Sequence, residues 1–359
     1  MTYLERFKNV VYFGKPDRPF FWPQWVFQET IKRWQKEGMP IDVHFNTYFG
    51  FDRIEYAPIN LGFIPAPEVK IIEEDKETAT YIDDLGNKWK RWKDREIGMS
   101  QWIEFCIKDE ETWEKVKKRL NPDSPLRYPQ YYDDWKRCVK ERDYPLGVSA
   151  GSYYGWIRNW MGVENLSVMF YDNPELVKEI INYVADFVIK VLEKVVSEVK
   201  FDFANIWEDL GMKQGPLLSP KTFEEFCLPA YKKVCSFLKS HGIDVIMVDS
   251  DGNNDVIVPL WLEGGVNMLY PLEVAANTDA IEYRKKYGKK LILMGNIDKR
   301  ALRNTKKEVE EEVMKKVPYL LKEGGYFPFV DHAVPPDVPF ENFKYYLELV
   351  KKIWADINK

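Results

Sequence analysis

From residue 145 onward, short apolar runs alternate with longer segments that have a helical hydrophobic period. Each run is five or six residues long, as expected for parallel strands that are buried on both faces. These runs predict strands at 145–150, 203–207, 244–248, 266–270, 291–295 and 326–330. The segments between them predict helices at 173–199, 220–240, 253–263, 278–287, 306–323 and 340–357. The alternation is typical of an α/β fold with a parallel sheet.

Two weaker strand candidates lie earlier in the chain, at 19–22 and 53–59. They bring the number of predicted strands to eight, which favours a single (β/α)8 TIM barrel spanning residues 1–359. Residues 66–98 break the pattern: apolar and polar residues alternate around Asp84-Leu85-Gly86-Asn87. This predicts a β-hairpin insertion in the N-terminal part, which would overhang the barrel mouth. Residues 107–143 have a helical period and are expected to pack outside the barrel.

Composition narrows the class of protein. Hydrophobic residues make up 45% of the chain and charged residues 30%, with a net charge of −5, which is typical of a globular protein with a large core. The absence of a basic tract argues against nucleic-acid or anionic-membrane partners. The N-terminus lacks a signal-peptide pattern, and no stretch reaches the roughly 18 apolar residues of a membrane span. Four isolated cysteines without a C-x-x-C pair predict reduced thiols in a cytoplasmic protein. A monomer and a homodimer both stay open.

Polar residues follow most of the predicted strands, where a barrel of this type carries its chemistry. They are Gln24, Gly151 to Tyr154, Glu208, Asp209, Asp249 to Asn253, Glu273, Gly295 to Asp298, Asp331 and His332. Loops are polar in any protein, and an aspartate such as Asp209 or Asp298 also serves as a helix cap. At least four carboxylates on one rim would nevertheless raise one another's pKa unless a cation neutralised them. Aromatic residues make up 15% of the chain; they would line a broad cavity or simply fill the core.

Asp249 and Asp251 are the sharpest feature of the sequence. Gly252 follows them and permits a turn that would bring both carboxylates to one point. Together with Glu208 and His332, they would form an oxygen-rich set for a hard divalent cation. A metal-free polar substrate site and a set of structural caps remain alternatives. His332 precedes the rigid Ala333-Val334-Pro335-Pro336 loop, and would be a neutral ligand, a proton shuttle or a partner of Asp331.

These residues lie in a sequence that resembles the uroporphyrinogen decarboxylase superfamily, which includes zinc-dependent cobalamin methyltransferases and O-demethylases. The resemblance is densest over 146–345: GSYYGWIRNW, IWEDLGMKQGPLLSPKTFEEFCLPAYKK, LMGNID and GGYFPFVDHAVPPDVPFENF. The N-terminal DRPFFWPQWVFQ resembles the opening strand and loop of the family. The resemblance implies a single (β/α)8 barrel, in agreement with the strand count.

The decarboxylase branch carries an R-Q-A-G-R motif in its opening loop, whose arginines hold the substrate's carboxylates. This chain has Gln24 and Gln28 in their place, and a glutamine does not neutralise a carboxylate. Tyr154 and His332 match the tyrosine and the late histidine of that branch. The resemblance therefore implies a related enzyme that is not a true uroporphyrinogen decarboxylase.

The methyltransferase branch holds zinc through an H-x-C pair, a later cysteine and, in some members, a glutamate. The corresponding places here are Asp249-Ser250-Asp251, His332 and Glu208, without any thiolate. Such a set would bind zinc less tightly or prefer a harder ion. The resemblance thus implies a metal-dependent methyltransferase that exchanges a methyl group with a corrinoid partner protein.

Two alternatives stay open. One is a metal-independent decarboxylase or lyase, in which an aspartate stabilises a cationic intermediate and His332 moves protons. The other is a non-catalytic barrel that binds a cofactor or amine in an acidic, aromatic cavity. For all of these the substrate is a small molecule. The expected catalytic residues are Tyr154, Asp251 and His332; the expected substrate-binding residues are Gln24, Gln28, Tyr154, Glu273 and Asn296; and the expected metal ligands are Glu208, Asp249, Asp251 and His332.

Overall fold

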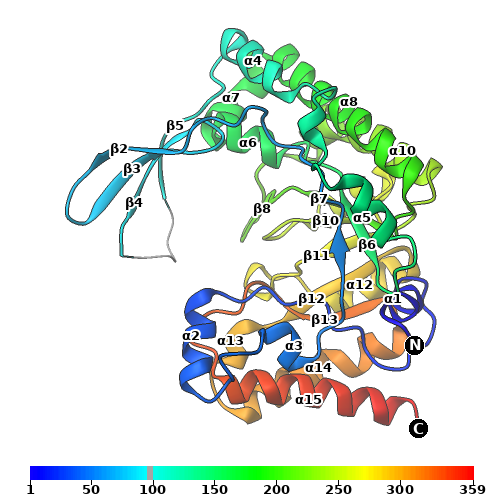
Figure 1. Cartoon of the computed structure of the whole chain (residues 1–359). Coiled ribbons are helices and arrows are strands. Elements are labelled where there is room, and N and C mark those ends of the chain that lie inside the picture. Colours follow the sequence, from blue (N-terminus) through cyan, green and yellow to red (C-terminus); the bar gives the residue numbers. More distant parts are fainter. Residues whose placement is uncertain (95–99) are drawn as a thin grey trace.

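The computed structural model describes residues 1–94 and 100–359, so residues 95–98 of the predicted insertion lie outside the described residues. Seven parallel strands form one curled sheet, with helices packed along its outer side (Figure 1). In spatial order the strands are β1 (Glu55–Tyr56), β6 (Leu146–Ser149), β7 (Phe203–Trp207), β10 (Ile246–Asp249), β11 (Met268–Tyr270), β12 (Ile292–Ile297) and β13 (Tyr326–Val330). The predicted α/β class with a parallel sheet is confirmed. The predicted closure into an eight-stranded barrel is not confirmed.

The helices fall close to where the hydrophobic period predicts them. They are α1 (Tyr3–Val11), α2 (Gln28–Lys36), α3 (Phe45–Phe49), α4 (Glu110–Lys117), α5 (Tyr132–Cys138), α6 (Gly155–Met161), α7 (Val163–Asp172), α8 (Pro174–Glu198), α9 (Pro220–Thr222), α10 (Leu228–Ser240), α11 (Val258–Gly264), α12 (Ala280–Tyr287), α13 (Lys299–Leu302), α14 (Lys306–Glu323) and α15 (Phe340–Ile357). A π-helical turn, Phe223–Cys227, joins α9 to α10. The predicted bounds of α14 and α15 are the observed ones, because a capping box at Thr305 and the turn at Pro339 mark where each helix begins.

The two faces of the sheet carry different parts of the core. Along β10, Ile246 and Val248 pack toward the helices, while Met247 belongs to a second cluster inside the curl. The same alternation places Phe203 of β7 and Met268 of β11 inside. Because strand side chains alternate with a period of two, the last inward position of each strand follows from this register. Trp207, Asp249 and Tyr270 occupy those positions. Asp249 lies opposite Trp207 on one side and Tyr270 on the other, and all three line a common cavity.

The predicted strand at 19–22 is wrong, since this segment forms no strand. Its apolar residues are nevertheless buried: Phe20 and Trp22 point into the inner cluster, where their rings contact the ring of Phe327. The apolar character of this segment therefore indicates that its side chains are buried, and not that its backbone pairs with a neighbouring strand. The predicted strand at 53–59 is confirmed only as the two-residue strand β1, which pairs with β6.

The predicted hairpin is part of a four-stranded antiparallel sheet, which we call the arm: β2 (Lys70–Glu74), β3 (Thr78–Ile82), β4 (Lys88–Trp92) and β5 (Gln101–Glu104). The predicted turn at 84–87 joins β3 to β4, where backbone N–H groups of Leu85 and Asn87 donate to the Asp83 carboxylate. The fourth strand lies beyond the predicted boundary at residue 98. The arm projects away from the parallel sheet (Figure 1).

Within the described residues, no helix is both long enough and apolar enough to cross a bilayer. All four cysteines are free thiols, as the sequence predicts. A short two-stranded ribbon, β8 (Gly211–Met212) and β9 (Gly215–Pro216), follows β7 and bears on the site described next.

Candidate functional site

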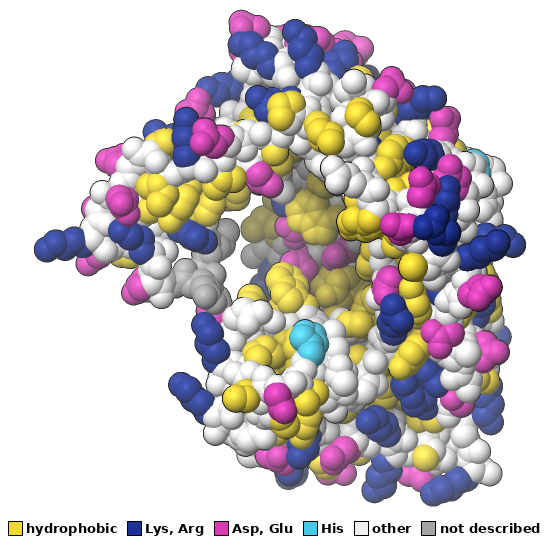
Figure 2. Space-filling model, in the orientation of Figure 1, with side chains coloured by type: hydrophobic (Ala, Val, Ile, Leu, Met, Phe, Trp, Pro, Cys, Tyr) yellow, Lys and Arg dark blue, Asp and Glu magenta, His cyan; other side chains and the backbone are white. Residues whose placement is uncertain are grey.

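A cavity of about 190 Å³ lies at the carboxyl ends of β7, β10 and β11. Its wall combines aromatic and acidic side chains: Trp25, Trp207, Asp209, Asp249, Asp251, Tyr270 and His332. Figure 2 shows that this face of the molecule is hollowed, with acidic and hydrophobic side chains inside the hollow. Neither a lysine nor an arginine lines the cavity in the described part of the chain. The cavity therefore favours a cationic occupant.

The loop after β10 is held in a fixed turn that directs Asp251 toward the cavity. Gly252 has a φ of 78°, and a Cβ there would lie 2.3 Å from the carbonyl carbon of Gly211. Asn254 donates its amide N–H to the Asp251 carbonyl oxygen at 2.9 Å. Asn253 pairs with Met212 of β8, which ties the loop to the ribbon. The prediction that Gly252 supplies a permissive turn is confirmed.

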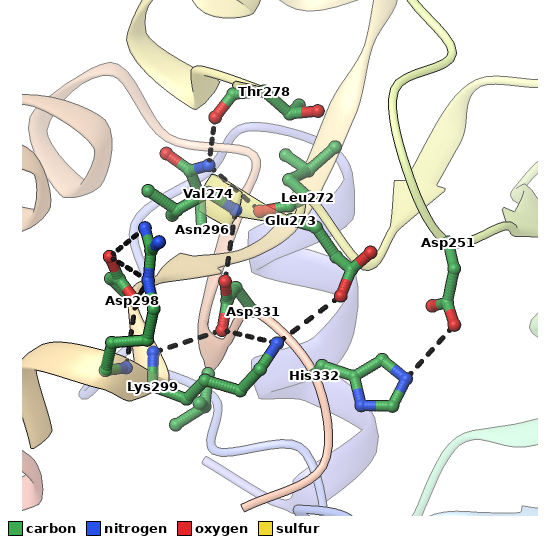
Figure 3. Close-up of polar contacts among 12 residues, drawn as sticks. Asp251, Leu272, Glu273, Val274, Thr278, Asn296, Asp298, Lys299, Asp331 and His332 are labelled. Atoms are coloured by element: carbon green, nitrogen blue, oxygen red, sulfur yellow. Dashed lines mark hydrogen bonds and ion pairs between the residues drawn. The ribbon is translucent and has the colours of Figure 1, made fainter. Parts of the chain in front are cut away.

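Three side chains with donor atoms of the kind that bind metals gather around this loop. The His332 Nε2 lies 3.1 Å from an Asp251 carboxylate oxygen, and Glu273 adds a second carboxylate. One donor atom from each residue lies within 4.8 Å of the other two, and Figure 3 shows them facing a common space. Burial lowers the pKa of His332, but the hydrogen bond to Asp251 and its negative charge outweigh burial, so the pKa is raised. The contact with Asp251 therefore favours the imidazolium form of His332.

Glu273 is positioned by contacts that leave it facing Asp251 and His332. The Gly252 N–H donates to its Oε2 at 2.9 Å, and the Lys299 ammonium donates to its Oε1 at 3.3 Å. Lys299 also lies 3.4 Å from the Asp331 carboxylate, which in turn accepts the Val274 N–H at 3.0 Å (Figure 3). Contacts of this kind orient a metal ligand without occupying all its lone pairs.

Asp249 differs from the other acidic residues of the cavity because its side-chain carboxylate has no hydrogen-bond or ion-pair partner among the described residues. Burial is the main cause that raises its pKa to about 7, and the negative charges of Asp251 and Asp209 add to the effect. The sequence predicts that crowded carboxylates on this rim raise one another's pKa; at Asp249 the pKa is raised, with burial as the larger cause. At neutral pH this group is half protonated, so it can exchange a proton with a bound molecule.

Replacing Asp249 with asparagine is expected to remove a pH dependence of stability in the chelator-treated protein. The folded-state pKa is raised from 3.8 to about 7, so the folded state binds more protons than the unfolded state between about pH 4 and 7. The contribution of Asp249 to the wild-type free energy of unfolding must therefore fall as the pH rises through that window. The full rise in the pKa of Asp249 corresponds to a change of about 4 kcal/mol in the free energy of unfolding. Screening by solvent in the cavity reduces this change to about 2 kcal/mol.

Urea unfolding at pH 4, 6 and 8 measures this difference. Asp249→Asn should be more stable than wild type at pH 8 and nearly equal at pH 4. The matched control is Asp244→Asn, which makes the same change on an exposed residue just before the opposite end of β10. It should follow the wild-type pH profile. Parallel profiles for Asp249→Asn and wild type would contradict the assignment.

Glu208 does not join the predicted metal set. Its side chain is fully buried, and its two carboxylate oxygens accept hydrogen bonds from the backbone N–H groups of Tyr153, Tyr154 and Gly155 and from the hydroxyls of Ser152 and Tyr231. Burial is the main cause that raises its pKa. We therefore correct its role from metal ligand to an anchor that joins β7 to the start of α6 and to α10.

The other predicted binding residues also have structural partners. Gln24 accepts the Val330 N–H at 3.2 Å and donates to the His332 carbonyl oxygen at 3.4 Å. Asn296 is fully buried, and its amide groups bond to backbone atoms of Leu272, Thr278 and Ala280. Neither lines the cavity.

Tyr154 and Gln28 also lie outside the cavity wall. The Tyr154 ring is 2% exposed and packs in the outer core, where burial raises its pKa. Gln28 is exposed at the first turn of α2. Of the predicted residues, the structure thus brings together Asp249, Asp251 and His332 at the cavity, with Glu273 beside them.

The sequence suggested an aromatic-lined cavity as one of two interpretations, but it did not identify the residues of that wall, and it missed the role of Lys299. Trp25 lies next to Val26, which forms a β-bridge with Val334, two residues after His332. The centroid of the Trp25 ring lies 5.2 Å from that of the His332 ring. Trp207 and Tyr270 end β7 and β11, and their positions at strand ends are a signal that could have identified them. The role of Glu273 as a candidate ligand was also missed.

No thiolate is available to this site. Cys227 is buried, with its Sγ 3.8 Å from the Tyr153 carbonyl oxygen, and burial raises its pKa. Burial also raises the pKa of Cys235 and of Cys106 to about 12, and Cys138 is exposed on α5. None lines the cavity, so the ligand set is oxygen and nitrogen alone.

A family model for uroporphyrinogen decarboxylase (URO-D) matches residues 102–353, which is more than half of the chain. The chain belongs to the URO-D family. It is 22% identical over 184 residues to a uroporphyrinogen decarboxylase from Rickettsia bellii, and 27% identical over 197 residues to one from Campylobacter jejuni. Each alignment covers 51% of this chain and 51% of the relative, so the chain spans about half the length of the curated URO-D relatives it matches.

A solved methyltransferase from Methanosarcina mazei shares the fold of this URO-D family member over nearly its whole length. The TM-score is 0.64, and the match covers 99% of this chain and 100% of the other. The sequence identity is 14%, so the likeness concerns the fold.

Proposed function

We propose that this URO-D family member is a metal-dependent methyltransferase that exchanges a methyl group with a corrinoid carried by a partner protein. The observation that carries the proposal is the cluster of Asp251, Glu273 and His332 beside the cavity. The proposal extends to this chain the activity named for the Methanosarcina mazei protein, with which it shares the fold. The partner would present its corrinoid at the cavity mouth.

The donor set fits a divalent cation. Two carboxylate oxygens and an imidazole nitrogen within 4.8 Å of one another can contract onto one ion. Without thiolates, the set suits zinc or a harder ion such as manganese or iron. When bound, the ion would supply Lewis-acid activation and lower the pKa of a methyl acceptor. The Gly252 N–H and the Lys299 ammonium keep Glu273 in place, and the Trp25 ring packs beside the His332 ring.

Free methylcobalamin, with 2-mercaptoethanol as the acceptor thiol, provides a test that does not require the natural partner. We expect the zinc-loaded protein to speed loss of the methyl–cobalt absorption, and chelator treatment to reduce the rate at least about tenfold. Zinc in buffer without protein is the control. Loss of methyl–cobalt absorption at the buffer rate, or at one rate with and without metal, would contradict the proposal.

A metal-independent lyase is the second candidate, and Asp249 is the observation that favours it. A carboxyl group with a pKa of about 7 at the cavity wall is suited to general acid–base catalysis without a cation. Chelation separates the two functions, because a lyase of this kind would keep its full activity without metal.

Decarboxylation of uroporphyrinogen itself is expected to be absent. No arginine or lysine of the described residues lines the cavity, and Gln24 is engaged with backbone atoms instead of facing the cavity. The cavity of about 190 Å³ is also smaller than the roughly 300–1,000 Å³ of pockets that enclose larger ligands. Fluorescence chromatography of oxidised products should show uroporphyrin alone. Formation of coproporphyrin would contradict this prediction.

A further inference from the structure

Three aromatic side chains line the cavity, and each also contacts a neighbour outside this set: Trp25 contacts Phe27, Trp207 contacts the Arg158 guanidinium, and Tyr270 contacts Phe329. Trp25, Trp207 and Tyr270 come from three separate parts of the chain and line one space. Within the described residues, none of the three rings stacks on another of the three. Trp25 is 55% exposed, so burial in the core does not explain it. Aromatic faces that line a cavity attract cations through the negative potential of the ring.

The charges of the site leave one carboxylate unmatched. Asp209 is paired with Arg158 at 2.9 Å, and Asp251 is paired with His332. Glu273 contacts Lys299. Of these four carboxylates, only that of Asp249 has no hydrogen-bond or ion-pair partner among the described residues, although it lines the cavity and is mostly buried; the charge of His332 acts on it only from a distance. When this carboxyl group is ionised, one positive charge on a molecule bound in the cavity would pair with it.

A bare metal ion does not satisfy this part of the site. Asp249 is absent from the group whose ligand atoms lie close enough to share an ion, and aromatic rings do not serve as ligands for hard divalent cations. An N-alkylated ammonium group has the required properties. It carries a single positive charge, its methyl groups donate no conventional hydrogen bonds, and its apolar surface packs against aromatic faces.

We propose that the cavity binds the N-alkylated ammonium group of a small substrate, with Asp249 opposite its charge and Trp25, Trp207 and Tyr270 around its alkyl groups. Binding of the ammonium group does not depend on the proposed function; only the identification of this molecule as the methyltransferase substrate rests on it. Asp251, Glu273 and His332 then hold the metal, and Asp249 with the aromatic wall holds the substrate.

Choline and 3,3-dimethylbutan-1-ol test the proposal, because they have the same shape and differ in the positive charge. Calorimetric titration at pH 8 should show choline binding at least about tenfold more tightly than the neutral alcohol. Asp249→Asn should weaken choline binding at least about tenfold. Trp25→Leu should weaken it several-fold, and Trp25 is exposed enough for the protein to stay folded. Asp244→Asn, on an exposed residue before the opposite end of β10, is the matched control and should leave choline affinity unchanged.

Equal affinity for the two probes, undetectable choline binding, or an Asp249→Asn protein that binds choline like wild type would overturn the proposal. Titrations with and without one equivalent of zinc separate this result from the proposed function. Choline binding by a protein that does not bind zinc would contradict the metal site alone. Zinc binding with no preference for choline would contradict the ammonium site alone.

Discussion

Replacing Glu208 with glutamine is expected to lower the free energy of unfolding by about 3 kcal/mol. The Glu208 carboxylate accepts three backbone N–H groups and two hydroxyls in a fully buried position. A glutamine would turn an amide N–H2 group toward at least one of these donors, and would weaken the bonds that remain because it carries no charge. Urea unfolding monitored by circular dichroism measures the loss.

The matched control is Glu224→Gln, which makes the same chemical change at an exposed position in the π-helical turn. Its stability should stay within about 0.5 kcal/mol of wild type. The folded Glu208→Gln protein should bind zinc as tightly as wild type. Full stability combined with lost zinc binding would show that Glu208 is a ligand after all.

Replacing Asp251 with asparagine is expected to reduce zinc affinity at least about 100-fold, or about 3 kcal/mol. The change removes a negatively charged donor from the group formed with Glu273 and His332. It also removes the hydrogen-bond partner that raises the pKa of His332. Thermal stability should stay constant or increase, because one source of repulsion on the Asp249 carboxylate is relieved.

Competition with a chromophoric chelator measures the affinity, and Asp244→Asn again provides the matched charge control. A variant that unfolds at a much lower temperature while keeping its zinc affinity would contradict the prediction. In that case Asp251 would stabilise the turn at Gly252 and would not be a metal ligand.

Much of the fold could be predicted from the sequence because buried parallel strands are apolar throughout. The strands β7 and β13 have the predicted bounds. The segment 19–22 was mispredicted for the same reason: Phe20 and Trp22 are buried in the inner cluster without a ladder partner. Apolar character records burial, whereas the pairing of a strand depends on neighbours that are distant in the sequence.

The candidate site was predicted only in part. Asp249 and Asp251 follow one predicted strand and His332 follows another, which placed all three on one rim, and the structure brings them to one cavity. Glu208 follows a strand in the same way, but its hydrogen-bond donors come from residues 152–155 and from Tyr231, which no local pattern reveals. Glu273 becomes a candidate ligand because of its contacts with Gly252 and Lys299, which lie 21 and 26 residues away.

The central claim is that two carboxylates and one imidazole hold a divalent metal beside the cavity. X-ray absorption at the zinc edge, on protein loaded with one equivalent of zinc, tests it most directly. The ligand set of Asp251, Glu273 and His332 predicts nitrogen and oxygen neighbours at about 2.0–2.2 Å, with the outer scattering of one imidazole. A sulfur neighbour at about 2.3 Å, or zinc that washes off the protein before measurement, would contradict the claim.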